Sequence, residues 1–252
     1  MTELIELHEA TCRNATYKQG LIDLIGDLNI KITNMVEVGS YQGESTIIFA
    51  DNINGLQELH AIDPWSNGYA PGDACSDKYP MSVVESNFDI RTKNFSVIKK
   101  HKTTSKEFVK EIADGSLDFV YIDGDHTYEG CKSDITLWLP KVKKGGYICF
   151  DDYLDWEFSP QVRGAVDSIV ESLDKNEYKV IGSLSYEHLK EFTELACKEC
   201  GWNINWIGEG VDEKGILDKF EQEFLNFCKP LVDIELGPQV VVPINESPAD
   251  AN

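Results

Sequence analysis

No apolar run in this 252-residue chain approaches the roughly 20 residues that a membrane-spanning helix needs. The first six residues, MTELIE, also lack the basic and long apolar regions of a signal peptide. Basic side chains are scarce: 23 Lys and Arg stand against 44 Asp and Glu, for a formal net charge of −21. An acidic surface repels phosphate backbones and anionic lipid, so we expect no nucleic-acid or membrane partner and a cytoplasmic location.

The chain also lacks a full set of zinc-binding cysteines. Its seven cysteines are an odd number, and several fall inside predicted strands or helices, which favours reduced thiols in a cytoplasmic protein. Cys197 and Cys200 have the spacing of half a zinc site, but no second CxxC or HxxxH pair accompanies them. We therefore favour ordinary thiols over zinc at this position.

Short apolar runs that alternate with helix-length segments make up most of the chain. Residues rich in β-branched and aromatic types predict strands at 35–38, 58–63, 95–99, 117–123, 146–151, 178–181 and 202–207. Helices are predicted between them at 44–52, 81–92, 105–113 and 160–173. This alternation predicts an α/β fold: a doubly wound, Rossmann-like, mostly parallel seven-stranded sheet with helices on both faces.

Three segments divide the chain. Residues 1–32 predict an N-terminal helical segment, residues 33–236 the α/β domain, and residues 237–252 a flexible tail rich in Pro, Asn, Asp and Ala. Within the domain, residues 64–82 form a long loop rich in Gly, Pro and aromatic residues. Loops of this length inside compact domains are usually functional or mobile.

Two predicted strands end in carboxylates. Residues 119–126 (FVYIDGDH) and 147–152 (YICFDD) place Asp123, Asp151 and Asp152 at the carboxyl ends of parallel strands, where open α/β sheets bind ligands. Neighbouring strands lie only about 4.8 Å apart. Carboxylates so close repel one another unless a proton or a cation intervenes, so a hard-cation site and an acid–base site are both open.

A glycine turn follows the first strand of the domain. In residues 37–45 (EVGSYQGES), Gly39 and Gly43 permit a tight turn before a helix whose N-terminus offers backbone N–H donors. The GxxxG spacing departs from the GxGxxG dinucleotide fingerprint, which makes a nicotinamide dehydrogenase less favoured. Asp63 ends the next strand, where an acid typically binds ribose hydroxyls, so a ribose-bearing cofactor is favoured.

Together these residues resemble class I S-adenosylmethionine-dependent methyltransferases. Within that class, residues 33–182 are most similar to metal-dependent O-methyltransferases: the catechol enzymes and, more closely, the macrocin and mycinamicin sugar enzymes. Residues 162–166 (VRGAV) resemble the helix that follows strand five in the sugar enzymes. The resemblance implies cofactor binding by Glu37, Gly39, Ser40, Tyr41, Gly43, Ser45, Asp63, Ser105 and Asp123.

The same resemblance implies a metal triad of Asp123, Asp151 and Asp152, and a general base at His126, three residues after the first metal ligand. Oxygen ligands suit Mg²⁺ first and Mn²⁺ next. A divalent cation on a hydroxyl oxygen lowers the pKa of that hydroxyl, and an imidazole can then remove its proton, with Asp123 also in the catalytic set. The predicted activity is O-methylation of a vicinal diol or catechol in a small molecule or sugar.

Alternatives remain at this point. Asp123 could cap a loop, Asp151 and Asp152 could begin a helix, and His126 could bond a backbone carbonyl. The protein could instead be a metal-independent N- or carboxyl-methyltransferase, or a non-catalytic binding module on the same fold. Related enzymes are often oligomers, so a homo-oligomer is also open.

The sequence leaves the methyl acceptor unnamed, because the loop at 64–82 is longer than in catechol enzymes and the part after residue 183 matches no family pattern. The loop aromatics could wall an acceptor or pack in the core: Trp65, Tyr69, Tyr79 and Trp156. The remaining histidines are predicted to be structural: His60, His101 and His188.

Overall fold

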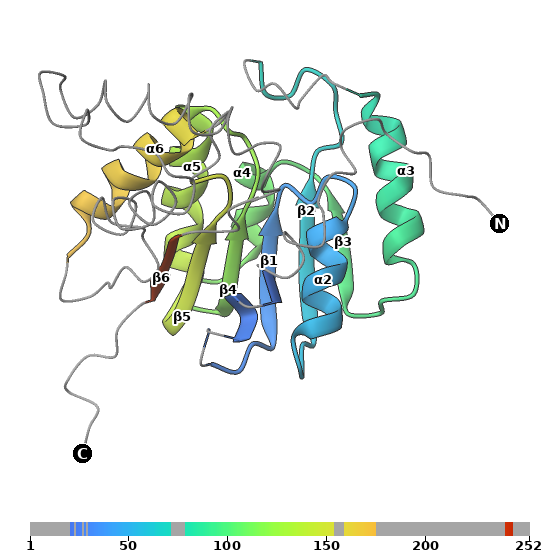
Figure 1. The fold of residues 1–252 in the computed structure, drawn as a ribbon, viewed down its shortest axis with the longest axis horizontal. Helices are drawn as coiled ribbons and strands as arrows, with labels where there is room; N and C mark the ends of the chain where they lie inside the picture. Colours follow the sequence, from blue (N-terminus) through green and yellow to red (C-terminus); the bar gives the residue numbers. More distant parts are fainter. Residues whose placement is uncertain are drawn as a thin grey trace, which may run out of the picture. The chain divides into compact units, whose positions relative to one another are not determined.

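The computed structural model describes residues 21–71 apart from 23, 27 and 29, and residues 79–153, 159–174 and 240–243. A six-stranded sheet runs through this part of the chain in the order β3-β2-β1-β4-β5-β6 (Figure 1). Its strands are β1 (Asn34–Val38), β2 (Glu58–Asp63), β3 (Ile98–Lys102), β4 (Leu117–Ile122), β5 (Val142–Phe150) and β6 (Val240–Pro243). The first five are parallel to their neighbours, and β6 pairs antiparallel with β5.

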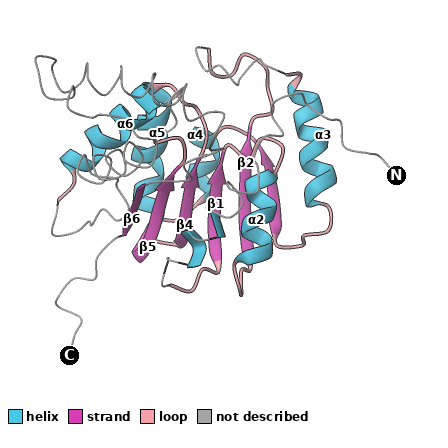
Figure 2. Cartoon of the chain, in the orientation of Figure 1, coloured by secondary structure: helices cyan, strands magenta, loops and turns pink. Residues whose placement is uncertain are grey.

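Helices cover both faces of this sheet (Figure 2). They are α2 (Glu44–Asn52), α3 (Met81–Thr92), α4 (Ser105–Phe108), α5 (Tyr128–Trp138) and α6 (Ser159–Ser172), with 3₁₀ turns at Val109–Glu111 and Leu139–Lys141. Phe49 of α2 and Phe88 of α3 are buried in one core layer with Phe119 of β4. Trp138 of α5 and Ala165 of α6 are buried in the layer on the opposite face.

The central strand β4 explains why an apolar run becomes a parallel strand. All six of its residues, LDFVYI, are buried, as expected for a strand that is covered on both faces. Its one charged residue, Asp118, accepts hydrogen bonds from the backbone N–H groups of Thr33 (2.6 Å) and Asn34 (2.8 Å) and pairs with Lys143. That carboxylate therefore ties the start of β1 to β4 and β5 at the edge opposite the strand ends that carry Asp123 and Asp151.

The predicted fold class is confirmed as a Rossmann-like α/β arrangement, and most boundaries agree within a few residues. The helices predicted at 44–52 and 81–92 and the strand at 58–63 have the observed bounds. The strand predicted at 95–99 instead spans Ile98–Lys102. The basic residues of this strand are stabilised there by ion pairs of Lys100 and Lys102 with Glu85 of α3.

Other predictions concern segments that lie outside the described residues. The two late strands at 178–181 and 202–207, and Cys197 and Cys200, lie outside them. Strand β6 was not predicted: it lies within the segment for which a flexible tail is expected, and its four residues, VVVP, are too short a run to stand out. Among the described residues, no helix is long and apolar enough to cross a lipid bilayer.

Candidate functional site

The carboxyl ends of the central strands lie side by side and bring the predicted site residues to one edge. The backbone N–H of Asp123, just past β4, donates to the carbonyl of Val38 at the end of β1 (2.8 Å). The N–H of Asp151, just past β5, donates to the carbonyl of Ile122 at the end of β4 (2.9 Å). These bonds continue the sheet by one residue and fix the backbone from which both aspartates project.

The turn after β1 approaches β4 so closely that only glycine fits. Gly39 has φ +86°, and a Cβ at this position would lie 1.7 Å from the carbonyl oxygen of Asp123 and 2.7 Å from the Cα of Gly124. Gly43, with φ +83°, is the N-cap of α2. The predicted tight turn is present, and Gly39 permits a close contact between this turn and the Asp123 strand end.

Glu37 and Ser40 place two buried polar atoms in this turn. The hydroxyl of Thr46 donates to Oε2 of Glu37, while Glu37 Oε1 and Ser40 Oγ have no hydrogen-bond partner among the described residues. Burial raises the pKa of Glu37 to about 7, and neighbouring hydroxyls, first that of Ser45, oppose the shift. Unsatisfied buried polar atoms are costly and rare, so this turn suits a bound polar ligand.

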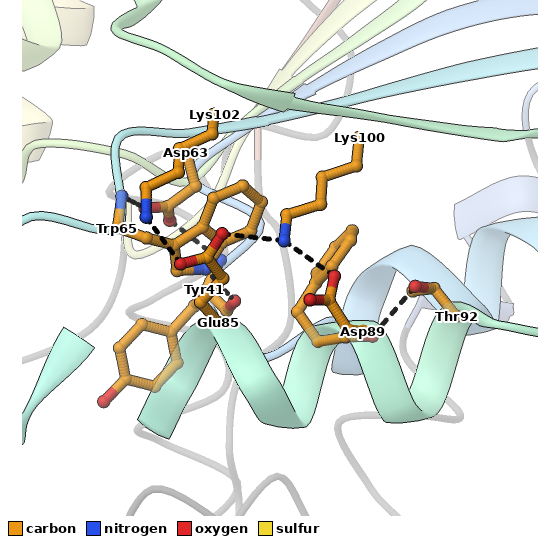
Figure 3. Close-up of polar contacts among 9 residues, drawn as sticks. Tyr41, Asp63, Trp65, Glu85, Asp89, Thr92, Lys100 and Lys102 are labelled. Carbon is orange, nitrogen blue, oxygen red and sulfur yellow. Dashed lines mark hydrogen bonds and ion pairs between the residues drawn. The ribbon is translucent and has the colours of Figure 1, made fainter. Parts of the chain in front are cut away.

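Asp63 has both carboxylate oxygens held by backbone donors. The N–H of Tyr41 donates to Oδ2 (2.9 Å) and the N–H of Trp65 to Oδ1 (2.7 Å), as the close-up shows (Figure 3). Burial raises the pKa of Asp63 to about 6 despite these two bonds. A carboxylate oxygen can accept more than one hydrogen bond, so the fixed carboxylate can still accept from a pair of ribose hydroxyls.

Ser105 uses its hydroxyl inside the protein. Its Oγ donates to Oδ1 of Asp134 (2.6 Å) and accepts from the indole N–H of Trp138 (2.7 Å). Burial raises the pKa of Asp134 to about 7, and the Ser105 bond opposes that shift. The donor proton of the Ser105 hydroxyl is therefore used within the protein, and only one acceptor lone pair of its oxygen is left for a ligand.

An acidic cluster with one imidazole lies beside the glycine turn. His126 Nε2 is 2.8 Å from Oδ2 of Asp152 and 3.4 Å from Oδ1 of Asp123, and one ligand atom of each residue lies within 4.8 Å of the others. The side chains of Asp123, His126 and Asp152 are 6%, 13% and 18% exposed. Asp152 has φ +55°, an unusual backbone conformation of the kind found at functional sites.

Asp151 lies outside this group of three ligand atoms, although it directly precedes Asp152 and is buried. The structure thus brings together two of the three predicted metal ligands with the predicted base. Asp125 accepts the backbone N–H of Thr127 (2.9 Å), which places it in the turn that begins α5.

The remaining candidate histidines and aromatic residues differ in their burial. His60 and His101 face each other (Nδ1 to Nε2, 3.0 Å) and pack against Phe108, as predicted for structural histidines. Tyr69 is 44% exposed and Tyr79 is half-buried, whereas Trp156 and His188 lie outside the described residues.

Trp65 is buried and packs against Phe88 with ring centroids 4.9 Å apart. The sequence left Trp65 as either a wall of the acceptor pocket or a core residue, and it did not predict the hydrogen bond of Trp65 to Asp63. The position directly after Asp63-Pro64 was the available signal.

Comparison with known proteins adds an independent line. Residues 36–153 match a family model described as a methyltransferase domain. This region is similar to a methyltransferase domain. The match runs from β1 through the Asp151–Asp152 pair and so includes the glycine turn, Asp63 and the acidic cluster. The match agrees with the methyltransferase resemblance that these residues indicated.

Two relatives match part of the chain, and their names give no substrate. Uncharacterized protein R132 of Acanthamoeba polyphaga mimivirus is 31% identical over 144 residues, which are 57% of this chain and 62% of that protein. Uncharacterized protein y4gI of Sinorhizobium fredii (strain NBRC 101917 / NGR234) is 25% identical over 148 residues, 58% of this chain and 15% of that protein. The chain therefore spans less than two thirds of each of these relatives.

A solved structure supports the fold. Cofactor-bound Rv0187 from MTB superposes with a TM-score of 0.51 at 16% identity, covering 70% of this chain and 76% of that one. At this identity the likeness establishes the Rossmann-like arrangement and nothing finer.

Proposed function

We propose that the protein transfers a methyl group from S-adenosylmethionine to a hydroxyl of a small molecule or sugar, with a divalent cation at the carboxyl edge of the sheet. The observation that carries the proposal is the juxtaposition of two half-sites. The glycine turn with Asp63 suits a ribose-bearing donor, and the cluster of Asp123, His126 and Asp152 suits hydroxyl activation.

The residues at the donor half-site fit S-adenosylmethionine. Asp63 offers a fixed, charged acceptor for ribose hydroxyls, and the unpartnered Glu37 Oε1 and Ser40 Oγ offer polar atoms to the rest of the molecule. S-adenosylmethionine supplies an electrophilic methyl group on a sulfonium. The task of the chain is to hold that methyl in line with the acceptor oxygen.

The acidic cluster fits a hard divalent cation. We propose Asp123, Asp151 and Asp152 as its ligands, since carboxylate oxygens are what Mg²⁺ and Mn²⁺ prefer. When bound, the cation lowers the pKa of a hydroxyl in contact with it.

We assign the base to His126. Its Nε2 lies 2.8 Å from the carboxylate of Asp152 and donates to it, so the neutral imidazole accepts the hydroxyl proton on Nδ1, and Asp152 then stabilises the imidazolium that forms. The same nitrogen lone pair could instead bind the metal, so the two roles of His126 exclude each other. A substitution that removes the His126 imidazole distinguishes the two roles. If His126 is the base, the variant keeps its affinity for the metal and loses methylation rate. If His126 is a metal ligand, the variant loses both.

One contact favours a second candidate, a metal-independent methyltransferase acting on nitrogen or a carboxyl group. A protonated His126 lies close enough to Asp123 and Asp152 to balance their charges without a metal. This arrangement predicts activity that is insensitive to chelators.

The test measures binding before turnover. Calorimetry with S-adenosylhomocysteine checks the donor site, and Mn²⁺ titration followed by electron paramagnetic resonance checks the metal site. Asp152→Asn should weaken Mn²⁺ binding by about tenfold or more, because a ligand charge is lost. Asp114→Asn is the matched control, since Asp114 is 75% exposed and paired with Lys141 beyond the opposite end of β4.

Turnover is then measured with a panel of vicinal diols and catechols in the presence and absence of EDTA. The metal-dependent proposal expects loss of methylation in EDTA and recovery with added Mg²⁺. Full methylation in EDTA would overturn the metal role and select the second candidate. Failure of the wild-type protein to bind S-adenosylhomocysteine would overturn both.

A further inference from the structure

A cation from β3 lies over the indole that follows Asp63. The Nζ of Lys100 is 4.8 Å from the ring centroid of Trp65 and 5.8 Å from that of Phe88. Two carboxylates of α3 hold this ammonium: Oε1 of Glu85 at 2.8 Å and Oδ1 of Asp89 at 2.7 Å (Figure 3). The cation therefore lies near both rings, and Trp65 contacts both the cation and the buried ring of Phe88, a favourable cation–π arrangement.

Trp65 is also bonded on two sides to the donor half-site. Its backbone N–H donates to Oδ1 of Asp63, and its indole N–H donates to the carbonyl of Tyr41 (2.7 Å). The N–H of Tyr41 closes the ring of contacts by donating to Oδ2 of Asp63. One oxygen of the Asp63 carboxylate is thus oriented by Trp65 itself, and the other by Tyr41, which is bonded to Trp65.

The backbone of this ring is unfavourable by itself. Tyr41 has φ +42° and Trp65 has φ +41°, in the left-handed region that non-glycine residues seldom adopt. Such conformations persist only where surrounding contacts hold them, and they gather at functional sites. The contacts that hold Trp65 come from its own indole N–H, from Phe88 and from Lys100.

We propose that Trp65 is a positioning residue for Asp63, and that Lys100, held by Glu85 and Asp89, fixes Trp65 for this role. The proposal rests on the proposed function, because it assigns Asp63 to ribose hydroxyls. In this arrangement a basic residue of β3 and two acids of α3 set the orientation of the ribose acceptor through Trp65. Loss of the cation should therefore impair ribose recognition in particular.

The chain offers a matched control two residues further along β3. Lys102 also pairs with Glu85 (Oε2, 2.6 Å), and its side chain is half-exposed, but no cation–π contact joins it to Trp65. Lys102→Met and Lys100→Met each remove one charge of β3 and one ion pair to Glu85. Only Lys100→Met removes the cation over the indole.

The experiment compares two ligands on four proteins. Calorimetry gives the Kd of S-adenosylhomocysteine and of its 2′-deoxy analogue for the wild type, Trp65→Phe, Lys100→Met and Lys102→Met. The ratio of the two Kd values measures how well Asp63 accepts the 2′-hydroxyl. A hydrogen bond to a charged group predicts a ratio of about tenfold or more for the wild type.

We expect this ratio to fall at least about threefold in Trp65→Phe and in Lys100→Met, since a misaligned carboxylate forfeits part of a charge-assisted bond. It should stay at the wild-type value in Lys102→Met. A purely structural role predicts a different result: both ligands would weaken equally, the ratio would not change, and the proposal would be overturned.

Two further outcomes separate this inference from the proposed function. If the wild type binds both ligands equally well, Asp63 does not read the 2′-hydroxyl and the inference fails, while the donor site stands. If the wild type binds neither ligand, the proposed function fails and the inference fails with it. Thermal melting of each variant checks folding, and Lys100→Met carries the test by itself if Trp65→Phe does not fold.

Discussion

Replacing Gly39 by alanine is the sharpest test of how the site is built. A Cβ at Gly39 would lie 1.7 Å from the carbonyl oxygen of Asp123, whereas Cβ contacts essentially never fall under 3.0 Å. The turn and the end of β4 must therefore move apart by at least the 1.3 Å between these values. That movement disrupts the hydrogen bonding between β1 and the end of β4, because the Asp123 N–H donates to the carbonyl of Val38.

The magnitude follows from two separable costs. The positive φ of +86° penalises any Cβ by about 1–2 kcal/mol. The overlap with fixed backbone adds a cost of the kind that makes single substitutions exceptionally destabilising, about 4 kcal/mol or more in total. Because Asp123 must shift, we also expect the folded fraction of Gly39→Ala to lose Mn²⁺ binding.

Gly115→Ala isolates the first cost. Gly115 has φ +65° and nothing within 4 Å of its added Cβ, so this variant should lose only about 1–2 kcal/mol. Urea denaturation monitored by far-ultraviolet circular dichroism measures both variants. Equal losses for the two would show that the turn has room for a side chain, and the reasoning about close backbone approach would be refuted.

Three further predictions concern buried polar groups. Because burial raises the pKa of Glu37 from 4.5 to about 7, its contribution is complete below pH 4.5 and is lost as the pH rises through 7, on the order of 3 kcal/mol. Glu37→Gln should flatten the decline in unfolding free energy between pH 5 and pH 8, and an unchanged slope would contradict this. Burial and then His60 lower the pKa of His101 from 6.5 to about 4, so its contribution is complete above pH 6.5 and is lost as the pH falls toward 4. His101→Gln should reduce the loss of thermal stability over that window, whereas a parallel pH profile would count against it. Ser105→Ala should cost about 1–3 kcal/mol in urea denaturation, because it removes the partner of both Asp134 and Trp138, and a near-neutral result would mean that the network is dispensable.

Much of the fold was predictable because its signals are local. Strand β2 and helices α2 and α3 have the bounds that their apolar runs predicted, since strand and helix periods are properties of consecutive residues. The glycine turn was predictable for the same reason. Strand β3 was misplaced by three residues, because its Lys-rich sequence is stable as a strand only beside the acids of α3.

The proximity of three predicted site residues was foreseen from the sequence, whereas several of their contacts were not. The sequence placed Asp123, Asp152 and His126 at one edge, and the structure brings their ligand atoms within 4.8 Å of one another. It did not foresee that Asp151 lies outside this group or that the Ser105 hydroxyl is used by Asp134. These outcomes depend on side-chain direction, which strand order does not specify.

By itself, the sequence determined the succession of strands and helices along the chain, the glycine turn and the carboxylates at the strand tips, because backbone preferences and short-range periodicity act within a few residues. Only the tertiary structure decided that Lys100 lies over Trp65, that Trp65 adopts the backbone conformation in which its N–H donates to Asp63, and that burial raises the pKa of Glu37 to about 7. The physical reason is that the Lys100–Trp65 contact joins residues 35 positions apart, that the positive φ of Trp65 is held by such distant contacts, and that the pKa of Glu37 depends on the exclusion of water. Neither exists until the sheet and its two helical layers have closed around the chain.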